Sequence, residues 1–298
     1  MEPPAQSPLK NLQSASSEPS TATFNSGDAA AQLVEGLQHH PFTSSQSLHM
    51  TLEKRRQALE QDKTRDQYLL FTAVPPAVFS RLSDDRSRTS KLSRFSYSET
   101  GTLVAKVMPS PEHHLSASSF EFLINLELHS MGLRHDVDSL GSATVTIGTW
   151  KKEADCCWAP AQQDTELSFV VEVGLSESAR HLALDARWWL EARSSSVKLV
   201  VTIGINRMNP EVIMQRWEIL PGEYHPLAGS SPGSARPSAT ITIYRTNNTT
   251  FISGGQLELP FEKVAGRQAN RPTERNLIVP EQRLRNFAEK IWRKQGFL

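Results

Sequence analysis

Apolar and polar positions follow a strand, helix, strand pattern in the middle of the chain. Residues 168–174 alternate between apolar and other side chains, and 197–205 are rich in β-branched residues, so both are predicted strands. Between them, apolar residues recur at helical spacing and predict a helix over 178–191, with Ser176 or Ser178 as its N-cap. Short joints between such elements predict neighbouring parallel strands in a buried sheet.

The same patterns predict the elements on either side of this unit. Gly101 supplies the turn of a hairpin between 94–97 and 102–107, and Gly132 ends a helix over 119–131. Further strands are expected at 144–149, 154–158, 211–219 and 239–244, and an amphipathic helix at 281–294. We expect 144–149, Asp155, Glu172 and 197–205 to lie on adjacent strands of one mixed sheet.

Composition divides the chain into four parts. Residues 1–50 are rich in Ser, Pro and Ala and are predicted to be disordered, with 1 to about 45 making no stable contact with the core. A charged helical arm and an apolar strap occupy 51–92, and the core occupies 93–245. A basic C-terminal extension with the terminal helix occupies 246–298.

Charge and cysteine content narrow the functional classes. The 32 basic and 32 acidic residues balance, so no overall field indicates a nucleic-acid or membrane partner. No apolar run is long enough to span a membrane. The adjacent Cys156 and Cys157 do not fit a disulfide or a structural zinc site, and we interpret them as structural. We expect an intracellular protein, cytoplasmic or nuclear, and leave its oligomeric state open.

Glu172 conflicts with its surroundings. It is a carboxylate inside an otherwise apolar strand, which is unfavourable unless the group is paired, protonated or bound to a metal. A metal ligand and a buried ion pair with an arginine are both open. Asp155, in the short predicted strand at 154–158, is either a second site residue or an ordinary turn or edge-strand carboxylate.

Three motifs occur in order along the chain: the Met-Pro-Ser-Pro-Glu-His run at 108–113, Asp155, and the Phe-Val-Val-Glu-Val run at 169–173. In this order they resemble the PD-(D/E)XK nuclease superfamily. The match spans roughly 94–220 and is nearest to a bacterial restriction-endonuclease branch. The tract around 170–190 also resembles a set of uncharacterised fungal proteins. The resemblance implies an α/β (α+β) fold, a restriction-endonuclease-like core with a mixed β-sheet flanked by helices.

The resemblance also implies a chemistry. Asp155 and Glu172 would be catalytic and would hold Mg²⁺, which activates water for phosphodiester hydrolysis of a nucleic-acid partner. The lysine of the motif would stand where this chain has Gly174, and aligning the helices puts Arg187 in the lysine's place. His113 and Arg180 would bind substrate.

Alternative interpretations accompany these assignments. Arg187 also suits a structural role at a helix border. Glu121 or Glu127 could add a carboxylate to the metal site, and Trp188 and Trp189 suit packing better than base stacking.

Two functions therefore compete, beside a plain α/β scaffold. A Mg²⁺-dependent nuclease is favoured by the retained Asp155 and Glu172. A catalytically inactive nuclease fold that binds nucleic acid or protein is favoured by Gly174. Neither function involves a membrane.

Overall fold

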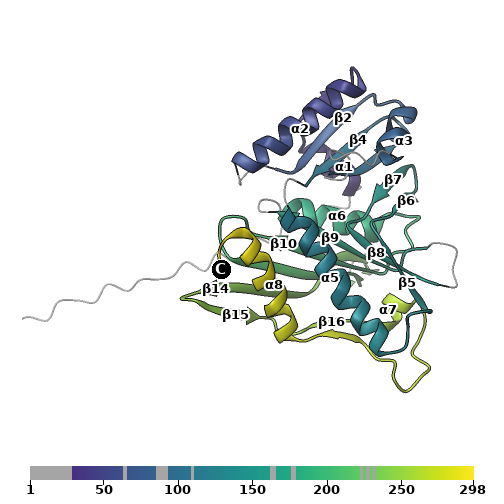
Figure 1. The fold of residues 1–298 in the computed structure, drawn as a ribbon. Helices are drawn as coiled ribbons and strands as arrows, with labels where there is room; N and C mark the ends of the chain where they lie inside the picture. Colours follow the sequence, from purple (N-terminus) through teal and green to yellow (C-terminus); the bar gives the residue numbers. More distant parts are fainter. Residues whose placement is uncertain are drawn as a thin grey trace, which may run out of the picture.

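The computed structural model describes residues 29–62, 66–84, 93–108, 111–161, 166–175, 179–221, 224–225, 229–230 and 233–298. Two large sheets with helices between and around them make up the fold (Figure 1). The expected mixed α/β class, with sheets flanked by helices, is confirmed. Across the described residues, no helix is both long enough and apolar enough to cross a membrane.

A seven-stranded mixed sheet, here called the core sheet, carries the largest apolar cluster. Its strands, in spatial order, are β15 (Thr249–Ser253), β14 (Ser234–Thr246), β11 (Glu211–Leu220), β10 (Leu199–Ile205), β9 (Phe169–Leu175), β8 (Cys156–Pro160) and β5 (Val137–Gly141). The predicted parallel pair is confirmed, because β9 and β10 run side by side from Leu199 opposite Phe169 to Ile205 opposite Leu175.

Helices cover the two faces of the core sheet. One face packs against α6 (Ala179–Glu191), and the other against α5 (Pro111–Ser130) and α8 (Glu281–Gln295) (Figure 1). The predicted helices over 178–191 and 281–294 are confirmed, and the proposed N-cap residues Ser176 and Ser178 lie outside the described residues. The smaller elements are α7 (Phe261–Ala265), the pair β16 (Leu257–Leu259) and β17 (Leu277–Val279), and the pair β12 (Tyr224–His225) and β13 (Gly229–Ser230).

A six-stranded sheet, here called the N-terminal sheet, lies over α6. Its strands, in spatial order, are β1 (His39–Pro41), β2 (Tyr68–Thr72), β4 (Leu103–Val107), β3 (Ser93–Ser98), β7 (Trp150–Glu153) and β6 (Thr144–Ile147). One face packs on α2 (Ser45–Gln61) and α3 (Pro76–Asp84), and the other places Tyr68, Leu70 and Val104 against α6. Helix α6 is therefore enclosed between the two sheets.

Two predicted elements are present, but the sheet of one and the start of the other differ from the prediction. The strand predicted at 144–149 is β6, at the edge of the N-terminal sheet, because the chain turns at Gly148 (φ 59°) into β7, which pairs with β3. The helix predicted at 119–131 starts earlier, at Pro111. Proline suits a first helical turn, where its missing N–H leaves no intrahelical bond unmade. The turn at Gly101 (φ 84°) and the helix end at Gly132 (φ 76°) are as predicted.

The prediction of disorder over 1–50 was wrong for residues 29–50. Helix α1 (Ala29–Glu35) packs on α6, with Leu33 buried beside Leu184 and Trp188. Few apolar residues occur in this segment, yet its three leucines, Leu33, Leu37 and Leu48, are buried. Residues 1–28 lie outside the described residues. The apolar strap expected within 51–92 contains strand β2, and β4 of the predicted hairpin (β3 and β4) pairs with it in the N-terminal sheet.

Candidate functional site

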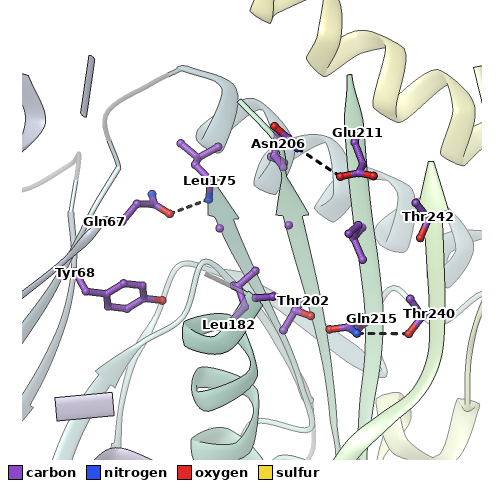
Figure 2. Close-up of a pocket in the computed structure, with 15 residues that line it drawn as sticks. Gln67, Tyr68, Leu175, Leu182, Thr202, Asn206, Glu211, Gln215, Thr240 and Thr242 are labelled. Carbon is purple, nitrogen blue, oxygen red and sulfur yellow. Dashed lines mark hydrogen bonds between the residues drawn. The ribbon is translucent and has the colours of Figure 1, made fainter. Parts of the chain in front are cut away.

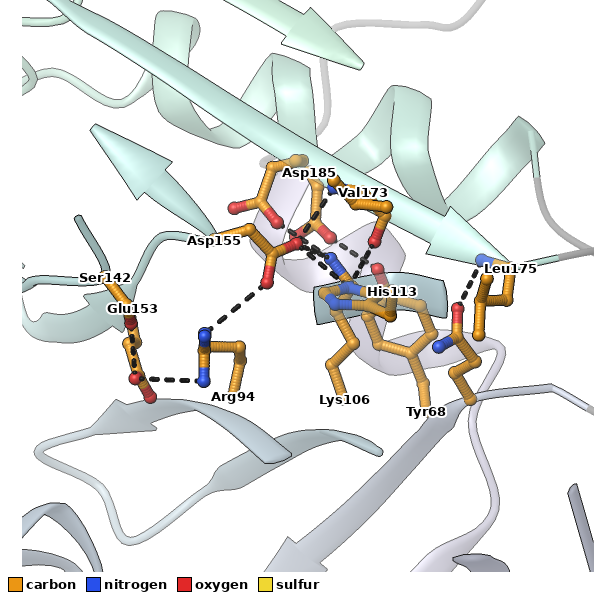
Figure 3. Close-up of polar contacts among 12 residues, drawn as sticks. Tyr68, Arg94, Lys106, His113, Ser142, Glu153, Asp155, Val173, Leu175 and Asp185 are labelled. Carbon is orange, nitrogen blue, oxygen red and sulfur yellow. Dashed lines mark hydrogen bonds and ion pairs between the residues drawn. The ribbon is translucent and has the colours of Figure 1, made fainter. Parts of the chain in front are cut away.

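Polar and charged residues from both sheets and from α6 meet in a buried group, here called the ion cluster. Its members are Tyr68, Lys106, Lys152, Asp155, Glu172 and Asp185, and Figure 3 shows several of them. The core sheet contributes Glu172 from β9, and Asp155 from the position just before β8. Because β8 pairs antiparallel with β9 up to Cys156 opposite Val171, Asp155 lies beside Glu172. The backbone N–H of Val173 donates to Asp155 Oδ2 at 2.9 Å, which fixes that carboxylate on the strand.

Lys106 joins the two carboxylates. It lies on β4 of the N-terminal sheet, and its Nζ is 2.7 Å from Asp155 Oδ2 and 2.8 Å from Glu172 Oε2. All three residues are buried, with exposed fractions of 4% for Lys106, 3% for Asp155 and 2% for Glu172. One ammonium thus lies between the two acids on which the sequence analysis centred.

Helix α6 completes the environment of Glu172. Its Trp189 donates an indole N–H to Glu172 Oε1 at 2.7 Å, so both oxygens of this carboxylate have a donor. One turn away, Asp185 accepts from Lys152 Nζ at 2.6 Å and from the hydroxyl of Tyr68. Tyr68 and Lys152 lie on the N-terminal sheet, so this second set of contacts also joins α6 to that sheet.

His113, at the start of α5, also contacts the carboxylate of Asp155. Its Nε2 is 2.9 Å from the carbonyl oxygen of Val173 and 3.3 Å from Asp155 Oδ2. A carbonyl can only accept, so Nε2 carries the hydrogen. Burial lowers the pKa of His113, which favours the neutral ring.

The remaining oxygen of Asp155 is less satisfied. Asp155 Oδ1 is buried without a hydrogen-bond partner, and Arg94 Nε lies 3.4 Å away. Burial raises the pKa of Asp155, but its contact with the His113 ring and the charges of Lys106 and Arg94 outweigh it and hold that pKa well below its usual range. This carboxylate is ionised.

Glu172 behaves in the opposite way. Burial is the main influence, and together with the nearby Asp185 and Asp155 it outweighs Lys106 and raises the pKa of Glu172 to about 7. Burial lowers the pKa of Lys106, but its acidic neighbours Asp155 and Glu172 more than offset it, so that pKa is raised overall. Glu172 is therefore the one acid of the cluster that can take up a proton near neutral pH.

The structure separates the other expected site residues from the cluster. Arg187 forms an ion pair with Glu191 on its own helix at 3.0 Å and also donates to Gln32 of α1. Arg180 is exposed at the start of α6. Neither approaches the carboxylates in the way the helix alignment implied, because the α6 face towards Glu172 carries Asp185 and Trp189 instead.

The alternatives considered for other residues also have definite positions. Glu121 accepts a hydrogen bond from Ser139, and Glu127 forms ion pairs with Arg275 and Arg283. These partners lie outside the ion cluster. Trp188 and Trp189 are buried, so they pack inside the molecule. Cys156 and Cys157 are buried free thiols.

Steric crowding explains why position 174 is a glycine. A Cβ atom at this position would lie 2.8 Å from Leu182 Cδ1 and 2.9 Å from Leu182 Cγ, so Leu182 fills the space that a side chain would need. The ammonium reaches the carboxylates from the N-terminal sheet instead. Lys106 was missed in the sequence analysis, although it interrupts an apolar strand just as Glu172 does; Tyr68 and Lys152 carried no comparable signal.

A bridging divalent ion does not fit this arrangement. Among the described residues, no group of three or more His, Cys, Asp and Glu side chains is arranged to hold a metal ion. The inward oxygens of Asp155 and Glu172 both bind Lys106, so a cation between them would have to displace that ammonium. The unsatisfied Asp155 Oδ1 is a possible ligand atom, but Arg94 already faces it.

Comparison with known proteins adds a loose structural likeness. No protein-family model matches the sequence, and no curated protein does. One similar solved structure is a DUF820 protein from Anabaena variabilis ATCC 29413 described as a candidate nuclease. It shares 12% identity with a TM-score of 0.37, over 65% of this chain and 90% of that chain. The resemblance to fungal proteins stays a prediction.

Proposed function

We propose that this protein is a binding protein with a nuclease-like core, in which the ion cluster holds two sheets together and does not hydrolyse phosphodiesters. One observation carries the proposal: the Lys106 ammonium lies between Asp155 and Glu172, and all three side chains are buried. A hydrolytic centre would need a metal ion at that position and a phosphodiester within reach of it.

The cluster is well placed for a structural role. Lys106, Lys152 and Tyr68 come from the N-terminal sheet, and Asp155, Glu172 and Asp185 come from the core sheet and α6. Every close contact among them crosses the boundary between the two layers. Buried charges that are paired in this way fix one relative arrangement, because any other leaves a charge unpaired in a medium of low polarity.

A cleavage assay tests the proposal directly. The full-length protein is incubated with Mg²⁺ or Mn²⁺ and with labelled single- and double-stranded DNA and RNA. We expect no cleavage beyond that of the Glu172→Gln protein, and no rise in melting temperature when millimolar Mg²⁺ or Mn²⁺ is added.

The opposite result has a clear signature. Metal-dependent cleavage that is lost in Asp155→Asn, Glu172→Gln and Lys106→Met would overturn the proposal and support a Mg²⁺-dependent nuclease. Glu99→Gln, at an exposed turn of the N-terminal sheet, is the matched control for removing a carboxylate.

A further inference from the structure

A pocket of about 390 Å³ opens beside the ion cluster, on the α6 side of the core sheet (Figure 2). Gly174 and Gly204 face each other in register on β9 and β10 and leave part of its floor without side chains. Leu182 of α6 and Gln67, just before β2, border it on one side (Figure 2). The opposite side is formed by β11 and β14.

The charge of the lining is negative. Among the described residues that line the pocket, Glu211 is the single carboxylate, and there is no Lys, Arg or His. Within the described part of the chain, no basic side chain is ion-paired with Glu211. Asn206 Nδ2 lies 3.5 Å from Glu211 Oε2, the outer limit of a hydrogen bond. The carboxylate is half-buried and keeps most of its hydrogen-bonding capacity.

An aromatic pair continues the pocket along the sheet. Tyr244 on β14 lies opposite Glu211, and Phe251 on β15 lies opposite Tyr244. The two rings stack with centroids 5.5 Å apart, and they are 39% and 42% exposed. Ile213, 37% exposed, lies next to them on β11 and also lines the pocket.

We propose that this pocket and the Tyr244–Phe251 pair form a docking site for an arginine or lysine side chain on a peptide segment of a partner protein. The inference rests on the proposed binding function and names its partner class. Leu182 and Ile213 suit the methylene part of such a side chain. Glu211 suits its charge, and the exposed ring faces suit a cation at the pocket mouth.

Charge also decides against a nucleic-acid occupant. Recognition of a nucleic-acid backbone rests on Lys and Arg contacts with phosphates. Because the described lining of this pocket carries one carboxylate and no basic group, it repels phosphate and attracts a cationic group.

The experiment compares a charged peptide with its neutral isostere. Isotope-labelled full-length protein is titrated with acetyl-Gly-Arg-Gly-amide, with the lysine peptide, and with the citrulline peptide, which has nearly the arginine shape without the charge. We expect chemical-shift changes centred on Ile213 and Thr242, with the citrulline peptide binding about tenfold more weakly than the arginine peptide.

Two variants test the site from different directions. Glu211→Gln removes the charge and should weaken arginine-peptide binding about tenfold. Gly204→Val fills the pocket, and a Cβ atom there meets nothing closer than 3.7 Å, so the strand should tolerate it. Glu99→Gln is the control and should bind like the wild type, and thermal melting checks that each variant is folded.

Several outcomes would overturn the site. They are equal binding of the citrulline peptide, unchanged arginine-peptide binding by Glu211→Gln, and single-stranded DNA or RNA binding that the pocket variants abolish. If Gly204→Val does not fold, Glu211→Gln alone decides. Nuclease activity is measured separately, so a protein that cleaves DNA and still binds the arginine peptide through Glu211 would refute the proposed function and leave this site standing.

Discussion

Glu172 and Glu211 lie on the same face of the core sheet, two strands apart, in opposite surroundings. Glu172 is buried and receives hydrogen bonds from Lys106 and Trp189, whereas Glu211 is half-buried at the edge of an open pocket. The N-terminal sheet covers the first carboxylate and stops short of the second. The covered carboxylate is therefore part of the buried contacts between the two layers, and the uncovered one is available for a partner.

The largest expected effect is on the covered side. Lys106→Met leaves Asp155 and Glu172 buried without the ammonium between them, and should lower the free energy of unfolding by about 3–5 kcal/mol. Urea denaturation measures this loss. Lys198→Met, which removes an exposed lysine before β10, should change it by no more than about 0.5 kcal/mol.

The same variant sharpens the question of metal binding. With the ammonium removed, the two carboxylates are free to take a divalent ion, so Mn²⁺ should raise the melting temperature of Lys106→Met but not of the wild type. Equal responses of the two proteins to Mn²⁺ would contradict the placement of Lys106 between the acids.

A second prediction concerns pH. The pKa of Glu172 is about 7 in the folded protein and 4.5 ordinarily, so the folded state binds this proton more tightly than the unfolded state. The contribution of this protonation to the free energy of unfolding is fully present below pH 4.5 and is lost as the pH rises through 7. It amounts to about 3 kcal/mol.

Glu172→Gln removes that titration. Its stability relative to the wild type should therefore rise between pH 4.5 and pH 7, measured by denaturation at a series of pH values. Glu99→Gln should follow the wild-type curve. A constant difference between Glu172→Gln and the wild type across this range would show that Glu172 titrates normally.

A smaller effect separates the two glycines of the pocket floor. Gly174→Ala forces a methyl group against Leu182 and should cost about 1 kcal/mol, whereas Gly204→Ala meets only ordinary contacts and should be neutral or slightly stabilising. Thermal melting of the two variants in parallel tests this. Equal melting temperatures would mean that Leu182 moves aside freely.

The smallest effect on stability is expected at the uncovered carboxylate. Glu211→Gln changes a half-buried group without an ion pair, so the free energy of unfolding should change by less than about 0.5 kcal/mol. A large loss of stability in this variant would indicate a structural role for Glu211 and would weaken the comparison with Glu172.

Local patterns predicted the local elements well. The β9–α6–β10 unit and α8 follow from periodicity, because their apolar stripes face the core that they build. Asp155 and Glu172 could be chosen as a pair from the resemblance and from the unfavourable placement of Glu172. The side of each helix that faces the sheet could also be judged, but not which residue of α6 would meet Glu172.

The pairing of strands that are far apart in sequence could not be predicted from local patterns. Nothing in the sequence of 144–153 indicates that β7 pairs with β3, and β6 with β7, and that neither joins the core sheet. Lys106 lies 49 residues before Asp155, and only the layering of the two sheets brings them together. Residues 29–50 were predicted to be disordered from their average composition, which does not reveal the few leucines that become buried.

The route of the chain through the two sheets has a consequence for folding. The N-terminal sheet takes strands from 39–72, 93–107 and 144–153, and between the last two segments the chain leaves it to form α5 and β5 of the other layer. No single cut releases one sheet intact, since a chain starting at residue 93 would lose β2 and expose an edge of β4. The two layers should therefore unfold together, in one cooperative transition, and their contacts must be assembled from segments far apart in sequence, which favours slow folding.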